Sequence, residues 1–527
     1  MRAGTRPESA DGGPGRKVVK LVVDKQLVTL AELREAWSGP VEISLGIEAR
    51  RAIAEASEYI ADVVDSGAEI YGVNTGFGQL ARVHISDDEL VKLQENLVRS
   101  HSVGVGEDLD DNIVRLIMLM KVVALAEGFS GVRLELVDTL CALINHNVYP
   151  RIPAKGSVGA SGDLAPLAHM ASVLIGVGEA RVNGQLVSAE EALAHAGVEP
   201  IRLAPKEGLA LLNGTQVSTA LALAAVFRSE NVLAAALVAG AMSADAVKGS
   251  DTPFDRRIHS VRGHGGQTAV AGVLRQLMRD SEIRESHLEC EHIQDPYSIR
   301  CQPQVIGACL DVLRHVCTVL EIEANAVTDN PLVFTESHTV LSGGNFHAEP
   351  VAFAADYLAL AIAEIGALSE RRIALLVDEH MSGLPAFLVQ DGGLNSGFMM
   401  VQVTAAALAS ENKSLAHPAS VDSIPTSANQ EDHVSMATFA AHRLHTMLHN
   451  TADIVAIELL AAAQGIEFHR PKKSSPPIEK TIAAVRSVSR SYTEDRSLSR
   501  DIARLSDMID SGAFCEHAAS VLPSLGA

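Results

Sequence analysis

The sequence has little positive charge and few cysteines, and both shortages limit what the protein can do. Its 43 lysines and arginines stand against 65 aspartates and glutamates, for a formal net charge of −22. Sequence-independent binding to nucleic acid or to an anionic membrane requires a basic field, so we expect neither partner. The 6 cysteines in 527 residues include no Cys-x-x-Cys pair, which argues against a disulfide framework and against a thiolate zinc site. These features are typical of a cytoplasmic protein with reduced thiols.

The sequence also lacks a secretory signal and an uninterrupted membrane span. Residues 1–17 contain no apolar run, and we expect them to form a flexible tail. The longest uncharged run, Gly208–Phe227, is long enough to cross a membrane, but lipid does not tolerate the polar side chains that it carries. These are Asn213, Thr215, Gln216, Ser218 and Thr219. We therefore expect this run to be a buried interior segment.

Aromatic residues make up only 4% of the chain whereas 47% is hydrophobic, so its core must come mostly from alanine, leucine and valine. Such a composition favours close packing of helices. Apolar residues from Ile306 to Val327 recur at alternating steps of four and three, which predicts one long helix with a single buried stripe. We expect a mainly α fold, with a smaller mixed α/β domain over residues 18–122 and a long-helix bundle over residues 123–527. Shorter predicted elements are strands at Leu21–Val23 and Val41–Ile43 and helices at Glu48–Val64, Val401–Leu415 and His442–Ala463.

The segment Lys155–Leu167 contains the residues that are best suited to a chemical reaction. Small residues crowd a turn that ends at Asp163, a residue type that caps helix N-termini. One interpretation is an ordinary junction between a loop and a helix, which composition alone favours. The other is a bend so tight that the Gly162 nitrogen attacks the Ala160 carbonyl carbon, where any Cβ on the glycine would hinder the approach. Loss of water, including the Ser161 hydroxyl, then leaves an electrophilic methylidene on a five-membered ring.

Six motifs, in the same order, resemble those of the aromatic amino acid ammonia-lyases over nearly the whole chain. The most specific is Gly159–Leu167, which matches the family's signature for the 4-methylideneimidazol-5-one (MIO) prosthetic group. The resemblance implies that MIO forms autocatalytically from Ala160-Ser161-Gly162 in the loop at 159–163, with no metal or nucleotide required. It also implies a homotetramer whose active sites combine residues of different subunits. The other five motifs are Tyr71–Gly78, Gly208–Thr215, Gln294–Arg300, Gly344–His347 and Ser427–His433.

The resemblance also implies roles for residues at matching positions. Tyr71, on a glycine-rich loop of the N-terminal domain, would be the catalytic base, which requires a pKa below the usual ~10 of tyrosine. Arg300 would hold the substrate carboxylate with a bidentate fork, and Tyr297, three residues earlier, would also belong to the catalytic group. The remaining positions are Asn213 and Gln294, which would hydrogen-bond the carboxylate or orient MIO, and Phe346, which would wall the site.

Two polar positions bear on which amino acid is the substrate. His101 and Glu431 match the family positions that face the substrate side chain. An imidazole both donates and accepts hydrogen bonds and suits such a pair, whereas a phenyl ring would leave the pair without partners. We therefore expect elimination of ammonia from L-histidine to give trans-urocanate, the first step of histidine degradation. A phenylalanine or tyrosine ammonia-lyase, or a MIO-dependent aminomutase, is the alternative.

Functions outside this family have weaker support. The 20 histidines include no His-Glu-x-x-His, and His347-Ala348-Glu349 matches only the first half of a zinc deaminase signature, so we expect no metal site. The aspartase/fumarase lyases also combine long helices with tetramers, but their Gly-Ser-Ser-x-Met-Pro loop is missing from the sequence. A non-enzymatic helical scaffold is the last alternative, and it would not need an intact Ala-Ser-Gly triad.

Overall fold

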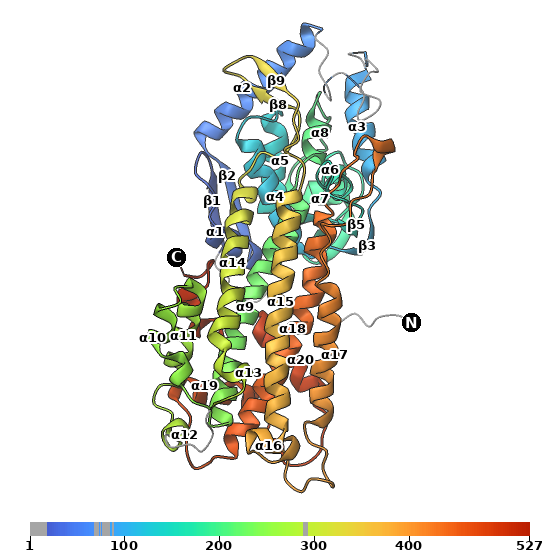
Figure 1. The fold of residues 1–527 in the computed structure, drawn as a ribbon. Coiled ribbons are helices and arrows are strands. Elements are labelled where there is room, and N and C mark those ends of the chain that lie inside the picture. Colours follow the sequence, from blue (N-terminus) through green and yellow to red (C-terminus); the bar gives the residue numbers. More distant parts are fainter. Residues whose placement is uncertain are drawn as a thin grey trace. The chain divides into compact units, whose positions relative to one another are not determined.

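The computed structural model describes residues 18–526 except residues 68–72, 74, 76–84, 87–88 and 288–293 (Figure 1). The expected tail at 1–17 and the predicted base Tyr71 lie outside the described residues. Helices dominate the described part and the strands are short, which confirms the expected mainly α fold. The chain divides into two compact units, the first from residues 1–224, 319–353 and 419–442 and the second from residues 225–318, 354–418 and 443–527.

This division differs from the expected domain boundary after residue 122. That boundary falls inside helix α4 (Asp111–Ala126), and residues 123–224 belong to the first unit. Helix α4 is buried at nearly every position from Ile113 to Ala126. A boundary in the middle of such a helix would expose its apolar side chains to water, which is unfavourable.

The first unit contains the described strands together with helices α1 to α8. Strands β1 (Val19–Val23) and β2 (Val41–Leu45) pair in parallel, with Val19 opposite Val41, which confirms both expected strands. The antiparallel pairs are β3 (Val105–Asp108) with β5 (Pro153–Lys155), β4 (Val148–Pro150) with β6 (Glu179–Val182), β6 with β7 (Gln185–Ser188), and β8 (Leu332–Phe334) with β9 (Thr339–Leu341). The other helices are α1 (Leu30–Ser38), α2 (Ile47–Asp65), α3 (Leu90–His101), α5 (Leu134–Asn145), α6 (Leu164–Leu174), α7 (Ala189–Ala196) and α8 (Glu207–Leu212).

The second unit is helical in its described part. Four long helices contribute residues to both units: α9 (Gln216–Ala246), α14 (Gln302–Ala324), α15 (Glu349–Val377) and α18 (Ala437–Glu467). The helices that belong to the second unit alone are α10 (Arg256–Ser260), α11 (Gly265–Met278), α12 (Glu282–Glu285), α13 (Tyr297–Arg300), α16 (Glu379–Ser382), α17 (Met399–Leu415), α19 (Pro476–Val488) and α20 (Ser499–Asp510).

The predicted long helices are confirmed, with one difference at the end of α14. That helix ends at Ala324, three residues before the predicted end at Val327. The Asn325 side chain explains the early end, because its Nδ2 donates to the Val28 carbonyl at 2.9 Å and its Oδ1 accepts the Val28 N–H at 2.8 Å. These two hydrogen bonds hold the Asn325 side chain against Val28, and the backbone bonds of Asn325 and Ala326 reach only three residues back, to Ile322 and Glu323.

Among the described residues, two helices are long and apolar enough to cross a membrane by length and composition alone. They are α9 and α15, and 94% and 67% of their most apolar windows are buried within the protein. The uncharged run Gly208–Phe227, which forms α8 and the start of α9, is buried as expected. Burial of this kind is typical of the core helices of a folded protein.

A buried ion pair fixes three helices of the second unit to one another. The Glu458 carboxylate on α18 accepts hydrogen bonds from Ser243 on α9 and Ser369 on α15, each at 2.6 Å. It also pairs with the guanidinium of Arg372 on α15, and both charged side chains are inaccessible to solvent. A buried charge is tolerated only when such partners replace its hydration.

Removing one member of this pair should therefore destabilise the protein strongly. We expect Glu458→Leu to lower the free energy of unfolding by about 3–5 kcal/mol, because Arg372 would remain charged and unpaired in the interior. The double variant Arg372→Met/Glu458→Leu should lose clearly less, since it removes both charges. Thermal and urea unfolding measure these changes, with Glu379→Gln at an exposed position as the control. A double variant as unstable as the single one would contradict this account.

Candidate active site

The Ala160-Ser161-Gly162 triad lies in the loop between β5 and α6, and its backbone requires glycine at the third position. Gly162 has a φ of +71°, and a Cβ at this residue would lie 2.2 Å from the Gly214 carbonyl oxygen. The same oxygen accepts the Asp163 N–H at 2.8 Å, which holds the loop against the segment after α8. Ala160 and Gly162 are buried, and Ser161 is half-buried. The triad is therefore bent and tightly packed, as the cyclisation chemistry requires.

Asp163 precedes α6, but its side chain does not cap that helix as we expected from the sequence. One carboxylate oxygen accepts the Ser157 hydroxyl at 2.9 Å and the Thr438 hydroxyl at 2.6 Å. The other accepts both the N–H and the hydroxyl of Ser218, at 2.7 and 2.9 Å. The carboxylate is fully buried, so these four donors replace its hydration and tie the loop to α9 and α18.

Asn213 contacts the triad directly. Its Nδ2 donates to the Ser161 carbonyl oxygen at 2.6 Å, while its Oδ1 is buried and has no hydrogen-bond partner among the described residues. The Asn213 carbonyl accepts a hydrogen bond from Lys121 Nζ at 2.8 Å, and the Ala210 carbonyl accepts a second one at 3.1 Å. Burial lowers the pKa of Lys121 to about 8. Lys121 thus supports the segment that holds Ser161.

Glu431 approaches the triad from a distant part of the sequence. The Ser161 hydroxyl donates to one of its carboxylate oxygens, and the hydroxyls of Thr426 and Ser427 donate to the other, at 2.6 and 2.9 Å. Burial raises the pKa of Glu431, but these hydrogen bonds and the field of His101 outweigh that effect and leave the pKa below its usual value. The structure therefore brings the two predicted substrate-facing residues, His101 and Glu431, into one electrostatic environment.

The turn before Glu431 has a strained backbone. The residues from Ser427 to Asn429 all have left-handed backbones, with φ values of 48°, 51° and 68°. Non-glycine residues rarely adopt this conformation, and strain of this kind is concentrated at functional sites.

At the other polar position, the Nδ1 atom of His101 lies 2.8 Å from the Leu97 carbonyl. Because a carbonyl only accepts, neutral His101 has its proton on Nδ1 and a lone pair on Nε2.

The predicted site residues fall in two groups. One group belongs to the first unit and includes Phe346, which is half-buried in the loop before α15. The other members of this group are His101, Ala160, Ser161, Gly162, Asn213 and Glu431. The second unit contains Gln294, Tyr297 and Arg300. Tyr71 lies outside the described residues, so its position and its role as base stay predictions.

Gln294 and Arg300 line one pocket of the second unit, with a volume of about 410 Å³. Tyr297 and Arg300 begin and end the short helix α13, and the guanidinium carbon lies 4.9 Å from the centre of the tyrosine ring. Arg300 Nε is buried without a hydrogen-bond partner among the described residues. An arginine with unused donors in a pocket is suited to binding a carboxylate.

The residues around the triad fit the MIO group that the resemblance implies. The Gly162 N–H donates to no group in the part of the chain that the structure describes, so the nitrogen is available for cyclisation. The buried Oδ1 of Asn213, which has no hydrogen-bond partner among the described residues, leaves a polar contact for the ring. Ala160, Ser161 and Gly162 would form the group, and Asn213 would hold it.

Four residues that support this site were not predicted as site residues from the sequence. They are Lys121, the donors Ser218 and Thr438 that hold Asp163, and Ser435, whose hydroxyl donates to the Gly159 carbonyl at 2.9 Å. The sequence could have indicated Lys121, because it is the one charged residue in the otherwise apolar run Leu116–Ala126 of α4. Ser218, Thr438 and Ser435 gave no such indication, since serine and threonine are common throughout the sequence.

Comparisons with known proteins show which family this chain resembles. The family model described as aromatic amino acid lyase matches residues 28–487. A histidine ammonia-lyase of Aromatoleum aromaticum is 59% identical over 490 residues, which cover 93% of this chain and 93% of the relative.

Solved structures show the same relationship. The histidine ammonia-lyase of Trypanosoma cruzi has a TM-score of 0.88 at 43% identity, covering 96% of both chains. A tyrosine aminomutase of Streptomyces globisporus has a TM-score of 0.90 at 36% identity, covering 95% of this chain and 98% of the other. With the bent Ala-Ser-Gly triad and a family match over most of its length, the chain belongs to the aromatic amino acid lyase family.

Proposed function

We propose that this protein is a cytoplasmic ammonia-lyase that converts L-histidine to trans-urocanate and ammonia. The observation that supports this substrate best is the Glu431 carboxylate, which contacts Ser161 and lies in the field of His101. As a carboxylate, Glu431 can accept a hydrogen bond from an imidazole N–H. Because a tyrosine aminomutase shares the fold, the assignment depends on these side chains and on the histidine ammonia-lyases among the relatives.

The proposed reaction divides the work among the predicted residues. MIO, formed from Ala160-Ser161-Gly162, supplies an electrophilic carbon that makes the substrate amino group a better leaving group. Tyr71 removes the β-proton, and Arg300 holds the carboxylate with its planar fork. Further hydrogen bonds come from Asn213 and Gln294, Tyr297 belongs to the catalytic group, and Phe346 walls the site.

We also propose that the protein works as a homotetramer. Large apolar side chains are exposed on two helices of the second unit: Tyr357 and Leu360 on α15, and Met400 and Val403 on α17. Exposed apolar side chains of this kind are suited to contacts between subunits, and closed symmetric assembly is the usual result. In such an assembly Ser161 and Arg300 of one site can come from different chains.

The first prediction tests the prosthetic group. Ser161→Ala removes the hydroxyl whose loss creates the methylidene, so turnover of L-histidine should fall by at least ~10³-fold while the protein stays folded. Intact-mass measurement should show the wild-type chain lighter by two water molecules than its sequence, and the variant without this loss. Ser487→Ala, at an exposed position, is the control. A Ser161→Ala variant with wild-type turnover would exclude the proposed chemistry.

The second prediction tests the substrate. Glu431→Gln should lower kcat/KM for L-histidine by at least ~100-fold, because a buried site built to bind imidazole would lose its charged acceptor. Any residual activity on L-phenylalanine should change much less. Absorbance of the unsaturated product follows both reactions, and Glu494→Gln at an exposed position is the control. Equal losses on both substrates would assign Glu431 to the shared chemistry instead of to substrate choice.

The third prediction tests the shared site. Ser161→Ala and Arg300→Ala should each be inactive alone, but coexpression of the two variants should restore part of the activity, since some mixed sites would contain both intact residues. Sedimentation should give a mass near four times 55.7 kDa. An active monomer would contradict the assembly, and a mixed tetramer without activity would place both residues on one chain.

A further inference from the structure

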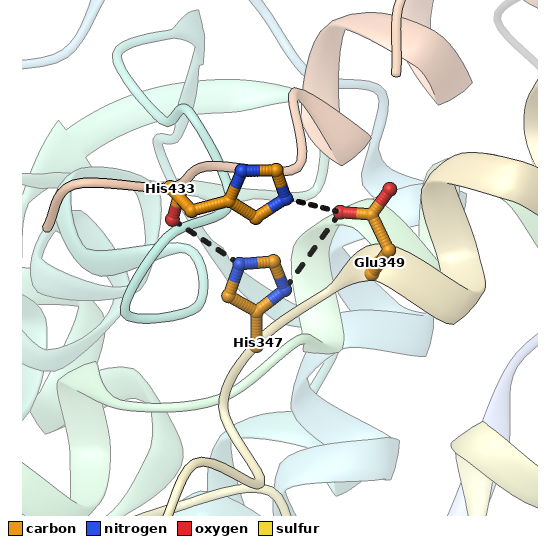
Figure 2. Close-up of side chains that lie close together, drawn as sticks. All are labelled: His347, Glu349 and His433. Carbon is orange, nitrogen blue, oxygen red and sulfur yellow. Dashed lines mark hydrogen bonds and ion pairs between the residues drawn. The ribbon is translucent and has the colours of Figure 1, made fainter. Parts of the chain in front are cut away.

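Three potential metal ligands converge beside the catalytic loop, on residues that the proposed elimination does not use. Figure 2 shows His347, in the loop before α15, and His433, in the loop after Glu431, both directed at the carboxylate of Glu349. His347 Nδ1 and His433 Nε2 each lie 3.9 Å from the same oxygen, Glu349 Oε2. All three ligand atoms lie within 4.8 Å of one another.

The hydrogen bonds of His347 leave it facing Glu349 with a lone pair. His347 Nε2 lies 3.2 Å from the His433 carbonyl oxygen, and a carbonyl can only accept. Neutral His347 therefore has its proton on Nε2, and its Nδ1 presents an unshared electron pair to the carboxylate. Two acceptors that face each other at this distance repel unless a cation lies between them.

No other described residue provides a hydrogen-bond partner for this Glu349 oxygen. Its Oε2 atom is shielded from solvent and has no hydrogen-bond partner among the described residues. A shielded carboxylate oxygen without a donor is costly, since it has lost its hydration and gained nothing. The unsatisfied oxygen and the lone pair of His347 thus point to the same missing positive charge.

His433 is oriented to complete the group. The rings of His347 and His433 lie parallel, with their centres 5.7 Å apart and their planes 5° apart, so both present a nitrogen to the same side. His433 Nδ1 contacts the Ser423 hydroxyl at 3.2 Å, which leaves Nε2 as its free ring nitrogen. Ser423 itself is held by the Val434 N–H at 3.0 Å. A hydrogen bond to the second ring nitrogen is the usual support of a metal-bound histidine.

We propose that His347, His433 and Glu349 bind a zinc ion. Two imidazoles and one carboxylate are a known ligand set for Zn²⁺, with metal–ligand distances of about 2.0–2.2 Å. In tetrahedral geometry these distances place ligand atoms roughly 3.4 Å apart, so small side-chain rotations close the present separations. His433 is the most exposed of the three side chains, so water can supply the fourth ligand.

The position of the group indicates a structural role for the ion. The Ala348 N–H, between two ligands, donates to the Gly159 carbonyl at 3.3 Å, and the Met436 N–H, close to His433, donates to the Val158 carbonyl at 2.8 Å. Zinc would therefore join the two segments that contact the catalytic loop at residues 158 and 159. The ion takes no part in the elimination, and the proposal does not depend on the substrate assigned above. The sequence showed only the pair His347-x-Glu349, since His433 follows 84 residues later in the chain.

Zinc binding to the full-length protein tests this proposal directly. Chelator-treated protein, equilibrated with Zn²⁺ and then desalted, should retain zinc close to one ion per chain by elemental analysis, and its Tm should rise on zinc addition. Co²⁺ added in place of zinc should give the visible absorption of a tetrahedral site with nitrogen and oxygen ligands. Failure of the wild type to retain zinc, with an unchanged Tm, would overturn the proposal and assign the missing charge to a proton.

Matched variants distinguish this site from adventitious binding. Glu349→Gln and His433→Asn should each weaken zinc affinity by more than ~10-fold in calorimetry, and Ser423→Ala by about 10-fold through the loss of its support of His433. His380→Asn is the control, because His380 also faces a carboxylate, Glu379 Oε1 at 3.7 Å, but has no third ligand among the described residues. Circular dichroism checks that each variant is folded. Wild-type affinity in the Glu349→Gln and His433→Asn variants would show that zinc binds elsewhere.

Discussion

Both oxygens of the Asp163 carboxylate are occupied by donors from three separate segments, at Ser157, Ser218 and Thr438. The carboxylate is fully buried, and a buried charge is stable only while its hydrogen bonds are complete. The loop that contains the Ala-Ser-Gly triad therefore has one position in the folded first unit. With its end fixed at Asp163 and its middle pressed against Gly214, the triad keeps the bend that ring formation requires.

The contacts around Ser161 show how charge supports this bend. Lys121 donates to two carbonyls at the C-terminal end of α8, where a cation is favoured by the helix dipole, and so fixes the position of Asn213. Asn213 in turn holds the Ser161 carbonyl, while Glu431 accepts the Ser161 hydroxyl. Loss of that hydroxyl during maturation would free one oxygen of Glu431. The same carboxylate would then be available to the substrate.

Other buried carboxylates in the protein differ in how fully hydrogen bonds and ion pairs replace their hydration. Glu458 in the second unit is satisfied by two serines and Arg372, and it fixes helices to one another. Glu349 is the exception, because its shielded oxygen faces two histidines at 3.9 Å and has no hydrogen bond to any described residue. This contrast is the physical basis for assigning a cation to Glu349 and none to Asp163 or Glu458.

The sequence by itself determined the helical class, the two parallel strands, the long apolar stripes and the identity of the triad, because these depend on local periodicity and on contiguous motifs. It did not determine that Asp163 binds side chains of α9 and α18 instead of capping α6. It also did not show that residues 123–224 belong to the same compact unit as the residues before them. Nor could it bring His433 to His347 and Glu349. These features depend on contacts between residues far apart in the chain, and only tertiary packing decides which distant donors, acceptors and charges meet.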